Sequence, residues 1–203
     1  MNHLRFEELC NCYLRLDASL KRKSSRNTLL RYWSKFVRLR DGGVCVLCSA
    51  AERVAAHHIC RKTFLKSAEF ETGNGISLCG PCHSEVHSGF NGRPDMFQPM
   101  DAQGGEKIEI MAGLYGDLLE HALRHGQLYE EFYYLSEKTL AVFKRLQGFE
   151  AASTIPGPRL QQACIIWQQS PLQIRNAILE ANGFMRRSEP LLPGVTVRNH
   201  VEL

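Results

Sequence analysis

Cysteine and histidine recur at short spacings between residues 45 and 87, and this segment constrains the fold more than any other part of the chain. It contains two Cys-x-x-Cys pairs and two pairs of histidines: Cys45 and Cys48, Cys79 and Cys82, His57 and His58, and His83 and His87. Four thiolates on two tight turns are typical of a closed, tetrahedral zinc site. We therefore predict a structural zinc ion at the four cysteines. The alternative is a set of buried cysteines that shares this spacing without a metal.

The two pairs of histidines differ in geometry. His83 and His87 are four residues apart on a predicted helix, so their imidazoles project from one face. His57 and His58 are adjacent at the end of a predicted strand, where successive side chains point to opposite faces. One of these two can join His83 and His87 around a divalent cation, while the other is left to act as a general base. Exposed polar residues without a metal are the alternative.

Charge is concentrated on the same part of the chain. The net charge is only +4, but residues 21–90 contain 12 Lys and Arg against 5 Asp and Glu. A basic segment is expected where a protein meets phosphates, although a solvated basic face would look the same.

The chain has no apolar run long enough to span a membrane and no secretory signal pattern at its start. We therefore expect a cytoplasmic protein with no membrane partner, whose cysteines are metal ligands or free thiols.

Apolar periodicity predicts a mostly helical chain around a small β unit. Helices are predicted over residues 4–20, 28–40, 81–88, 106–125, 128–147, 159–169 and 171–182. Two short β-branched segments, 44–47 and 53–59, predict a β-hairpin around the first Cys-x-x-Cys pair. The fold class is therefore α+β. The predicted organisation is N-terminal helices over 1–40, a metal module over 41–92, a linker over 93–105, a helical domain over 106–187 and an irregular tail over 188–203.

The order of these motifs resembles a known family. His57-His58-Ile59, then Asn74, then Cys79-x-x-Cys82-His83 and His87 are similar to the HNH, or ββα-metal, endonucleases of the type with a four-cysteine zinc. The resemblance covers about residues 28–90 and includes a spacing of nine residues between Asn74 and His83. The family signature falls on His58, Asn74 and His83. The resemblance implies a small ββα-metal module that hydrolyses phosphodiester bonds in DNA, in a context such as bacterial or phage defence and restriction.

The resemblance also implies a division of labour. His58 would deprotonate a water molecule, and His57, His83 and His87 would hold the ion that stabilises charge on the phosphate. Asn74 would fix the loop or orient His58. Many family members carry Asp where His57 stands, so this ligand departs from the family pattern. The ion can be Mg²⁺, Mn²⁺, Ni²⁺ or Zn²⁺, because imidazole ligands suit transition metals whereas phosphodiester hydrolysis often uses Mg²⁺.

Basic residues just after the histidine pair are candidates for binding nucleic acid. Arg61, Lys62 and Lys66 lie in the loop beyond His58 and are predicted to bind backbone phosphates, with a solvated loop as the alternative. The C-terminal half contains no catalytic pattern and is predicted to dock a partner protein or a second copy, or to shape the access of DNA. Two other functions remain open: a nuclease subunit active only with a partner such as an ATPase, and a non-catalytic zinc module that binds nucleic acid.

Overall fold

The structure is a computed structural model that describes residues 3–62, 64–87, 108–126, 128–150, 152–168 and 183. The predicted linker 93–105, helix 171–182 and tail 188–203 lie outside the described residues, and the domain boundaries stay predictions. Among the described residues, no helix combines the length and apolar character needed to cross a membrane. These residues form helices around one two-stranded antiparallel sheet, so the predicted α+β class is confirmed.

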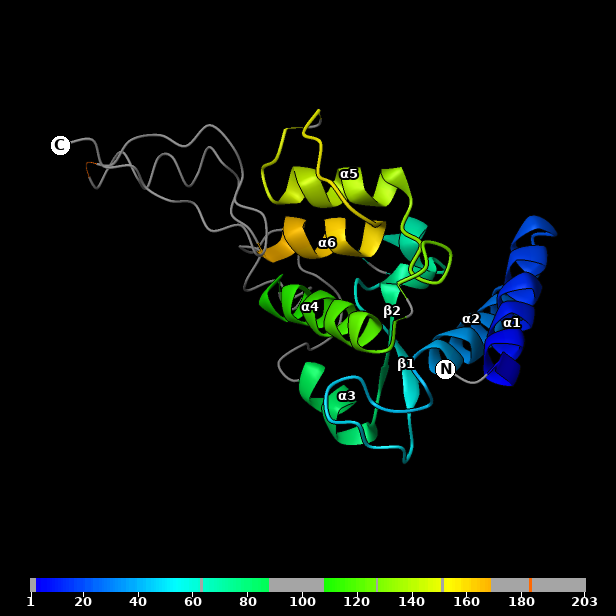
Figure 1. The fold of residues 1–203 in the computed structure, drawn as a ribbon. Coiled ribbons are helices and arrows are strands. Elements are labelled where there is room, and N and C mark those ends of the chain that lie inside the picture. The colour runs from blue at the N-terminus through cyan, green and yellow to red at the C-terminus, as the bar shows by residue number, and fades with distance from the viewer. Residues whose placement is uncertain are drawn as a thin grey trace.

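Two N-terminal helices pack against each other and support the sheet. They are α1 (His3–Lys21) and α2 (Arg26–Arg40), as the apolar periodicity predicts. Ser25 caps α2, because its side-chain oxygen accepts a hydrogen bond from the backbone N–H of Thr28 at 3.3 Å. One face of α2 buries Trp33, Phe36 and Val37, and this face contacts both strands. Figure 1 shows the α1–α2 pair on one side of the sheet.

The sheet pairs β1 (Ala55–His58) with β2 (Gly75–Leu78), so that His57 faces Ile76 and His58 faces Gly75. The predicted hairpin between 44–47 and 53–59 is therefore wrong, since 44–47 is not a strand. The Cys-x-x-Cys turn uses its backbone groups internally: Cys45 N–H donates to Ala50 O, and Ser49 N–H donates to Cys45 O, each at 2.8 Å. One bond from Val46 N–H to Ser77 O, at 2.9 Å, is what joins this segment to β2.

The connection from β1 to β2 contains two short 3₁₀ helices, η1 (Lys66–Ala68) and η2 (Thr72–Asn74). After β2 the chain turns at Cys79 into α3 (Gly80–Val86), where Pro81 occupies the first turn at no hydrogen-bonding cost. The predicted helix 81–88 is confirmed over the residues that the structure describes, with His87 as the C-terminal cap.

The C-terminal half contributes α4 (Ile108–Arg124), α5 (Glu137–Leu146) and α6 (Arg159–Gln168). Figure 1 shows α6 between α4 and α5, and both neighbours contact it. The predicted helix 128–147 is wrong in its first half, because Ser136 caps α5 and residues before it bond elsewhere. Tyr134 N–H donates to Thr72 Oγ1 at 2.9 Å, and Gly73 N–H donates to Tyr134 O at 2.8 Å.

A buried ion pair joins the two halves of the chain. Arg40 and Asp41 are 1% and 0% exposed. The Arg40 guanidinium donates to both Asp41 carboxylate oxygens and to the carbonyls of Thr72, Gly75 and Phe132, at 2.6 to 3.2 Å. Asp41 also accepts the Ser77 N–H at 2.8 Å. One hydrophobic cluster surrounds this junction and includes buried side chains from α1, α2, β2 and α4 to α6.

Candidate metal centres

The four cysteines lie together at one end of the sheet. Cys45 and Cys48 come from the turn after α2, and Cys79 and Cys82 from the start of α3. Their sulfur atoms all lie within 4.8 Å of one another, and those of Cys48 and Cys79 are 3.5 Å apart. A zinc–sulfur bond of about 2.3 Å places the sulfurs of a tetrahedral site about 3.8 Å apart. The group can therefore bind a metal ion such as zinc.

The electrostatics of the thiols also fit a cation. Burial raises the pKa of Cys45, but backbone N–H groups of Cys79, Cys48 and Leu47 outweigh it and lower this pKa to about 7. The pKa of Cys82 is raised by burial and by the three neighbouring thiols. The cluster therefore favours one thiolate but resists several at once. A bound divalent cation would remove that resistance, because a coordinating thiol is deprotonated by its metal.

Three histidines form the second group. His57 comes from β1, whereas His83 and His87 come from one face of α3. Their ring nitrogens lie within 4.8 Å of one another, and the ring centroids are 5.0, 4.9 and 4.5 Å apart. His57 is buried, while His83 and His87 are half-buried. The three rings thus converge on one point, with His57 on the enclosed side and the two rings of α3 on the more open side.

Two of these histidines, His57 and His87, are held in the state that binds metals. Burial lowers the pKa of His57 to about 3, and the nearby rings of His87 and His83 lower it further in the same direction. Burial also lowers the pKa of His87. Neutral imidazole offers a lone pair to a cation, whereas imidazolium cannot. The group is therefore suited to one divalent ion, held from a buried His57 and two half-buried rings.

His58 does not join this group, although it is adjacent to His57. Its ring stacks on the indole of Trp33, with the centroids 4.0 Å apart and the planes 6° apart. Its Nε2 lies 2.9 Å from the backbone oxygen of Glu69. Burial lowers the pKa of His58, which keeps the imidazole neutral. The structure thus places the two adjacent histidines in different surroundings.

Asn74 is fully buried and holds the loop that follows β1. Its Oδ1 accepts the Cys60 N–H at 2.8 Å, and its Nδ2 donates to the carbonyls of Cys60 and Ala68 at 2.9 and 3.0 Å. The Tyr115 hydroxyl from α4 donates to the same Oδ1 at 3.4 Å. The amide is therefore committed to the loop and to the C-terminal half, as expected for a residue that fixes structure.

The three predicted phosphate-binding residues differ in position. Arg61 is half-buried, and its Nη2 lies 3.3 Å from Nδ1 of His87, beside the histidine group. Lys62 and Lys66 are exposed on the connection from β1 to β2, where Lys66 is the first residue of η1. A guanidinium next to a cation site adds positive charge where an anion would approach, so Arg61 lies closer to the candidate chemistry than the two lysines.

Three residues contribute to the surroundings of His58, although the sequence did not predict this role for them. Trp33 and Glu69 contact His58, and Arg26 binds the Glu69 carboxylate through its Nε at 2.8 Å. Trp33 looks like an ordinary core residue of an amphipathic helix, and Glu69 acts through its backbone carbonyl, which no residue type signals. The pairing of Arg26 with Glu69 spans 43 positions in the chain.

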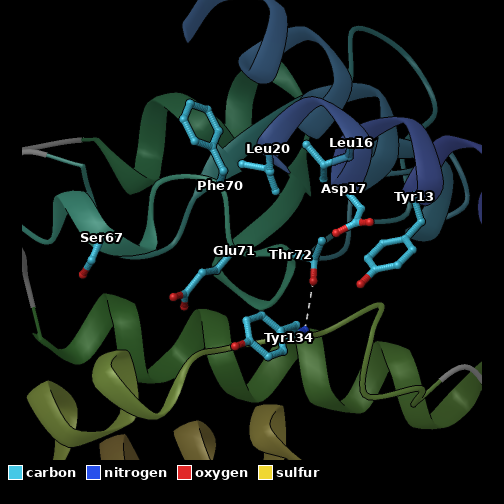
Figure 2. Close-up of a pocket in the computed structure, with 9 residues that line it drawn as sticks. All are labelled: Tyr13, Leu16, Asp17, Leu20, Ser67, Phe70, Glu71, Thr72 and Tyr134. Atoms are coloured by element: carbon cyan, nitrogen blue, oxygen red, sulfur yellow. Dashed lines mark hydrogen bonds between the residues drawn. The ribbon is translucent and has the colours of Figure 1, made fainter. Parts of the chain in front are cut away.

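A cavity of about 410 Å³ lies apart from these groups, between α1 and the η1–η2 segment. Figure 2 shows it bordered by Asp17 and Tyr13 of α1, and by Glu71 and Tyr134. Its carboxylates are already paired, since Asp17 binds Lys21 at 2.7 Å and Glu71 accepts hydrogen bonds from Ser136 and Thr139. None of the residues that line it belongs to either metal group.

Comparison of the chain with protein-family models, with curated proteins and with solved structures found no match.

Proposed function

We propose that this chain is a metal-dependent endonuclease of the HNH type that hydrolyses phosphodiester bonds in DNA. The observation that carries the proposal is the separation of four histidines into three that converge and one that is held apart, beside a four-thiol cluster. A closed thiolate site stabilises a small unit, whereas an imidazole site with open positions serves catalysis. The basic charge of residues 21–90 favours a phosphate-rich substrate.

In the proposed mechanism the residues of the chain position the substrate and the ion, and one of them accepts a proton. His57, His83 and His87 would hold a divalent ion, whose chemistry is to stabilise negative charge on the phosphate and on the leaving 3′ oxygen. His58 accepts a proton from a water molecule as the water oxygen bonds to phosphorus and the bond from phosphorus to the 3′ oxygen breaks. Arg61 binds a phosphate oxygen beside His87, and Lys62 and Lys66 bind the flanking backbone. Asn74 keeps the connecting loop in place.

The imidazole ligands favour Mn²⁺, Ni²⁺ or Zn²⁺ at this site, while the reaction also allows Mg²⁺. The four-cysteine group would hold Zn²⁺. Because imidazole nitrogens are softer ligands than carboxylates, we expect cleavage to be faster with Mn²⁺ or Ni²⁺ than with Mg²⁺ at equal concentration.

Plasmid cleavage tests the proposal. His58→Ala is expected to lower the rate by about 10²- to 10⁴-fold, which is the usual contribution of a general base. His125→Ala is the matched control, since it removes an exposed imidazole of the C-terminal half. Undiminished cleavage by His58→Ala would exclude His58 as the base. A wild-type chain that retains its zinc and binds DNA, but cuts none with any of the four ions, would favour the non-catalytic module or the partner-dependent subunit.

A further inference from the structure

The ring of His58 is stacked on an aromatic side chain. The indole of Trp33 lies parallel to the imidazole, with the ring centroids 4.0 Å apart. Trp33 is 1% exposed, so the indole that stacks on His58 belongs to the core and not to the surface. An imidazole stacked in this way cannot tilt out of its plane without separating the two rings. The stack therefore fixes the plane of the His58 ring.

Trp33 is itself fixed by two features from another part of the chain. Its Nε1–H donates to the backbone oxygen of Glu71 at 3.1 Å. Gly75, the β2 partner of His58, leaves room for the indole: a Cβ built there would lie 2.7 Å from Trp33 Cζ2 and 2.5 Å from Val37 Cγ2. Any side chain at this position would displace the indole of Trp33. The glycine is thus required by the close approach of Trp33 and Val37 and not by its own backbone conformation.

A hydrogen bond at the edge of the ring decides which of the two flipped orientations about the Cβ–Cγ bond His58 adopts. A carbonyl oxygen can only accept, so Nε2 must carry the hydrogen in the bond to Glu69 O at 2.9 Å. In the neutral ring the lone pair then belongs to Nδ1. Glu69 is held by Arg26, whose Nε donates to the carboxylate at 2.8 Å, so α2 sets both contacts of the imidazole.

We propose that Trp33 is a positioning residue for His58: the stacked indole, together with the bond to Glu69 O, holds the imidazole with its lone pair on Nδ1. This inference rests on the proposed function, because it assigns a role within that reaction. The proton passes from water to Nδ1, and the resulting imidazolium keeps its Nε2–H bond to Glu69 O. A stacked indole also favours the cation once it forms. Trp33 touches neither substrate nor metal ligand in this account, so it acts on the reaction through His58.

Three variants separate positioning from general support of the fold. Trp33→Leu removes the ring that stacks on His58, and Trp33→Phe replaces it with a smaller ring. Gly75→Ala keeps both rings but crowds the indole. Trp167→Phe is the control, since Trp167 is a buried tryptophan of α6 outside this contact. Each variant is measured below its own unfolding midpoint for single-turnover rate, DNA affinity and bound metal.

We expect Trp33→Leu and Gly75→Ala to lower the single-turnover rate by about 10²-fold, as for a misplaced reacting group. DNA affinity and metal content should stay unchanged, Trp33→Phe should restore part of the rate, and Trp167→Phe should keep the wild-type rate. Folded Trp33→Leu protein with the wild-type rate would overturn the proposal. So would a loss of DNA affinity or bound metal that fully accounts for the lower rate.

Nuclear magnetic resonance of the wild-type chain, labelled at histidine with ¹³C and ¹⁵N, tests the clamp without any substitution. We expect the His58 ring protons upfield of those of the other histidines, because the indole lies over them, and the Nε2–H tautomer. Unshifted ring protons or the Nδ1–H tautomer would overturn the proposal even if DNA is cleaved. If the wild-type chain cleaves no DNA, the proposed function fails, while the spectrum still decides whether His58 is clamped in this way.

Discussion

Cys48→Ser is expected to remove the tightly bound zinc and to unfold the segment around it. Cys48 is exposed, so the substitution costs no core packing and its effect must come through the metal. Zinc contributes about 10–16 kcal/mol to the folding of zinc-finger peptides, which shows how much a small unit can depend on it. Zinc content after dialysis against a chelator should fall from one ion to none, and thermal unfolding should begin at a lower temperature.

The loss should extend to the histidine group. Cys82 and His83 are adjacent in α3, a helix of only seven residues, so loosening one group moves the ligands of the other. We therefore expect Cys48→Ser to weaken Mn²⁺ or Ni²⁺ binding at His57, His83 and His87. Cys10→Ser is the control, because Cys10 belongs to neither metal group. Full zinc retention by Cys48→Ser, or an equal loss in Cys10→Ser, would contradict a four-thiolate site.

Arg40→Met is expected to destabilise the fold by about 3–5 kcal/mol, the usual cost of breaking a buried ion pair from one side. The substitution leaves the Asp41 carboxylate buried with its charge unpaired, and it frees the carbonyls of Thr72, Gly75 and Phe132 from a donor. Total stabilities of about 5–15 kcal/mol make this a large fraction. Urea unfolding followed by circular dichroism measures it.

Two further variants identify the cause of that loss. Arg38→Met removes an exposed arginine from the same helix and should change stability by less than about 0.5 kcal/mol. The double variant Arg40→Met, Asp41→Leu removes both charges and should recover part of the lost stability, because no unpaired charge stays buried. A double variant as unstable as the two single variants added together would argue against a coupled pair.

Local spacing predicts the metal groups well because their geometry is local. Two residues between cysteines make a turn that presents both sulfurs, and four residues between His83 and His87 place both rings on one helical face. Alternation along a strand likewise predicts that His57 and His58 point apart, and their surroundings differ accordingly. Helices α1, α2, α4 and α6 follow from apolar periodicity for the same reason.

Contacts between distant segments explain what spacing could not predict. Residues 44–47 have the composition of a strand, but their backbone closes the cysteine turn instead. Residues 128–136 have helical periodicity, but Tyr134 and Phe132 bond to Thr72 and Arg40. Arg40 and Asp41 at the end of a helix look like a solvated cap, because their partners lie more than thirty positions away.

A titration of the metal-free chain with Co²⁺, followed by absorbance and by plasmid cleavage in the same samples, tests the division into two sites most directly. We expect the first equivalent to produce thiolate charge-transfer bands without cleavage. The second equivalent should add weaker bands of a nitrogen and oxygen site, and cleavage should rise with it. Cleavage that is complete after the first equivalent, or a second ion that also binds thiolate, would contradict a structural cysteine site beside a catalytic histidine site.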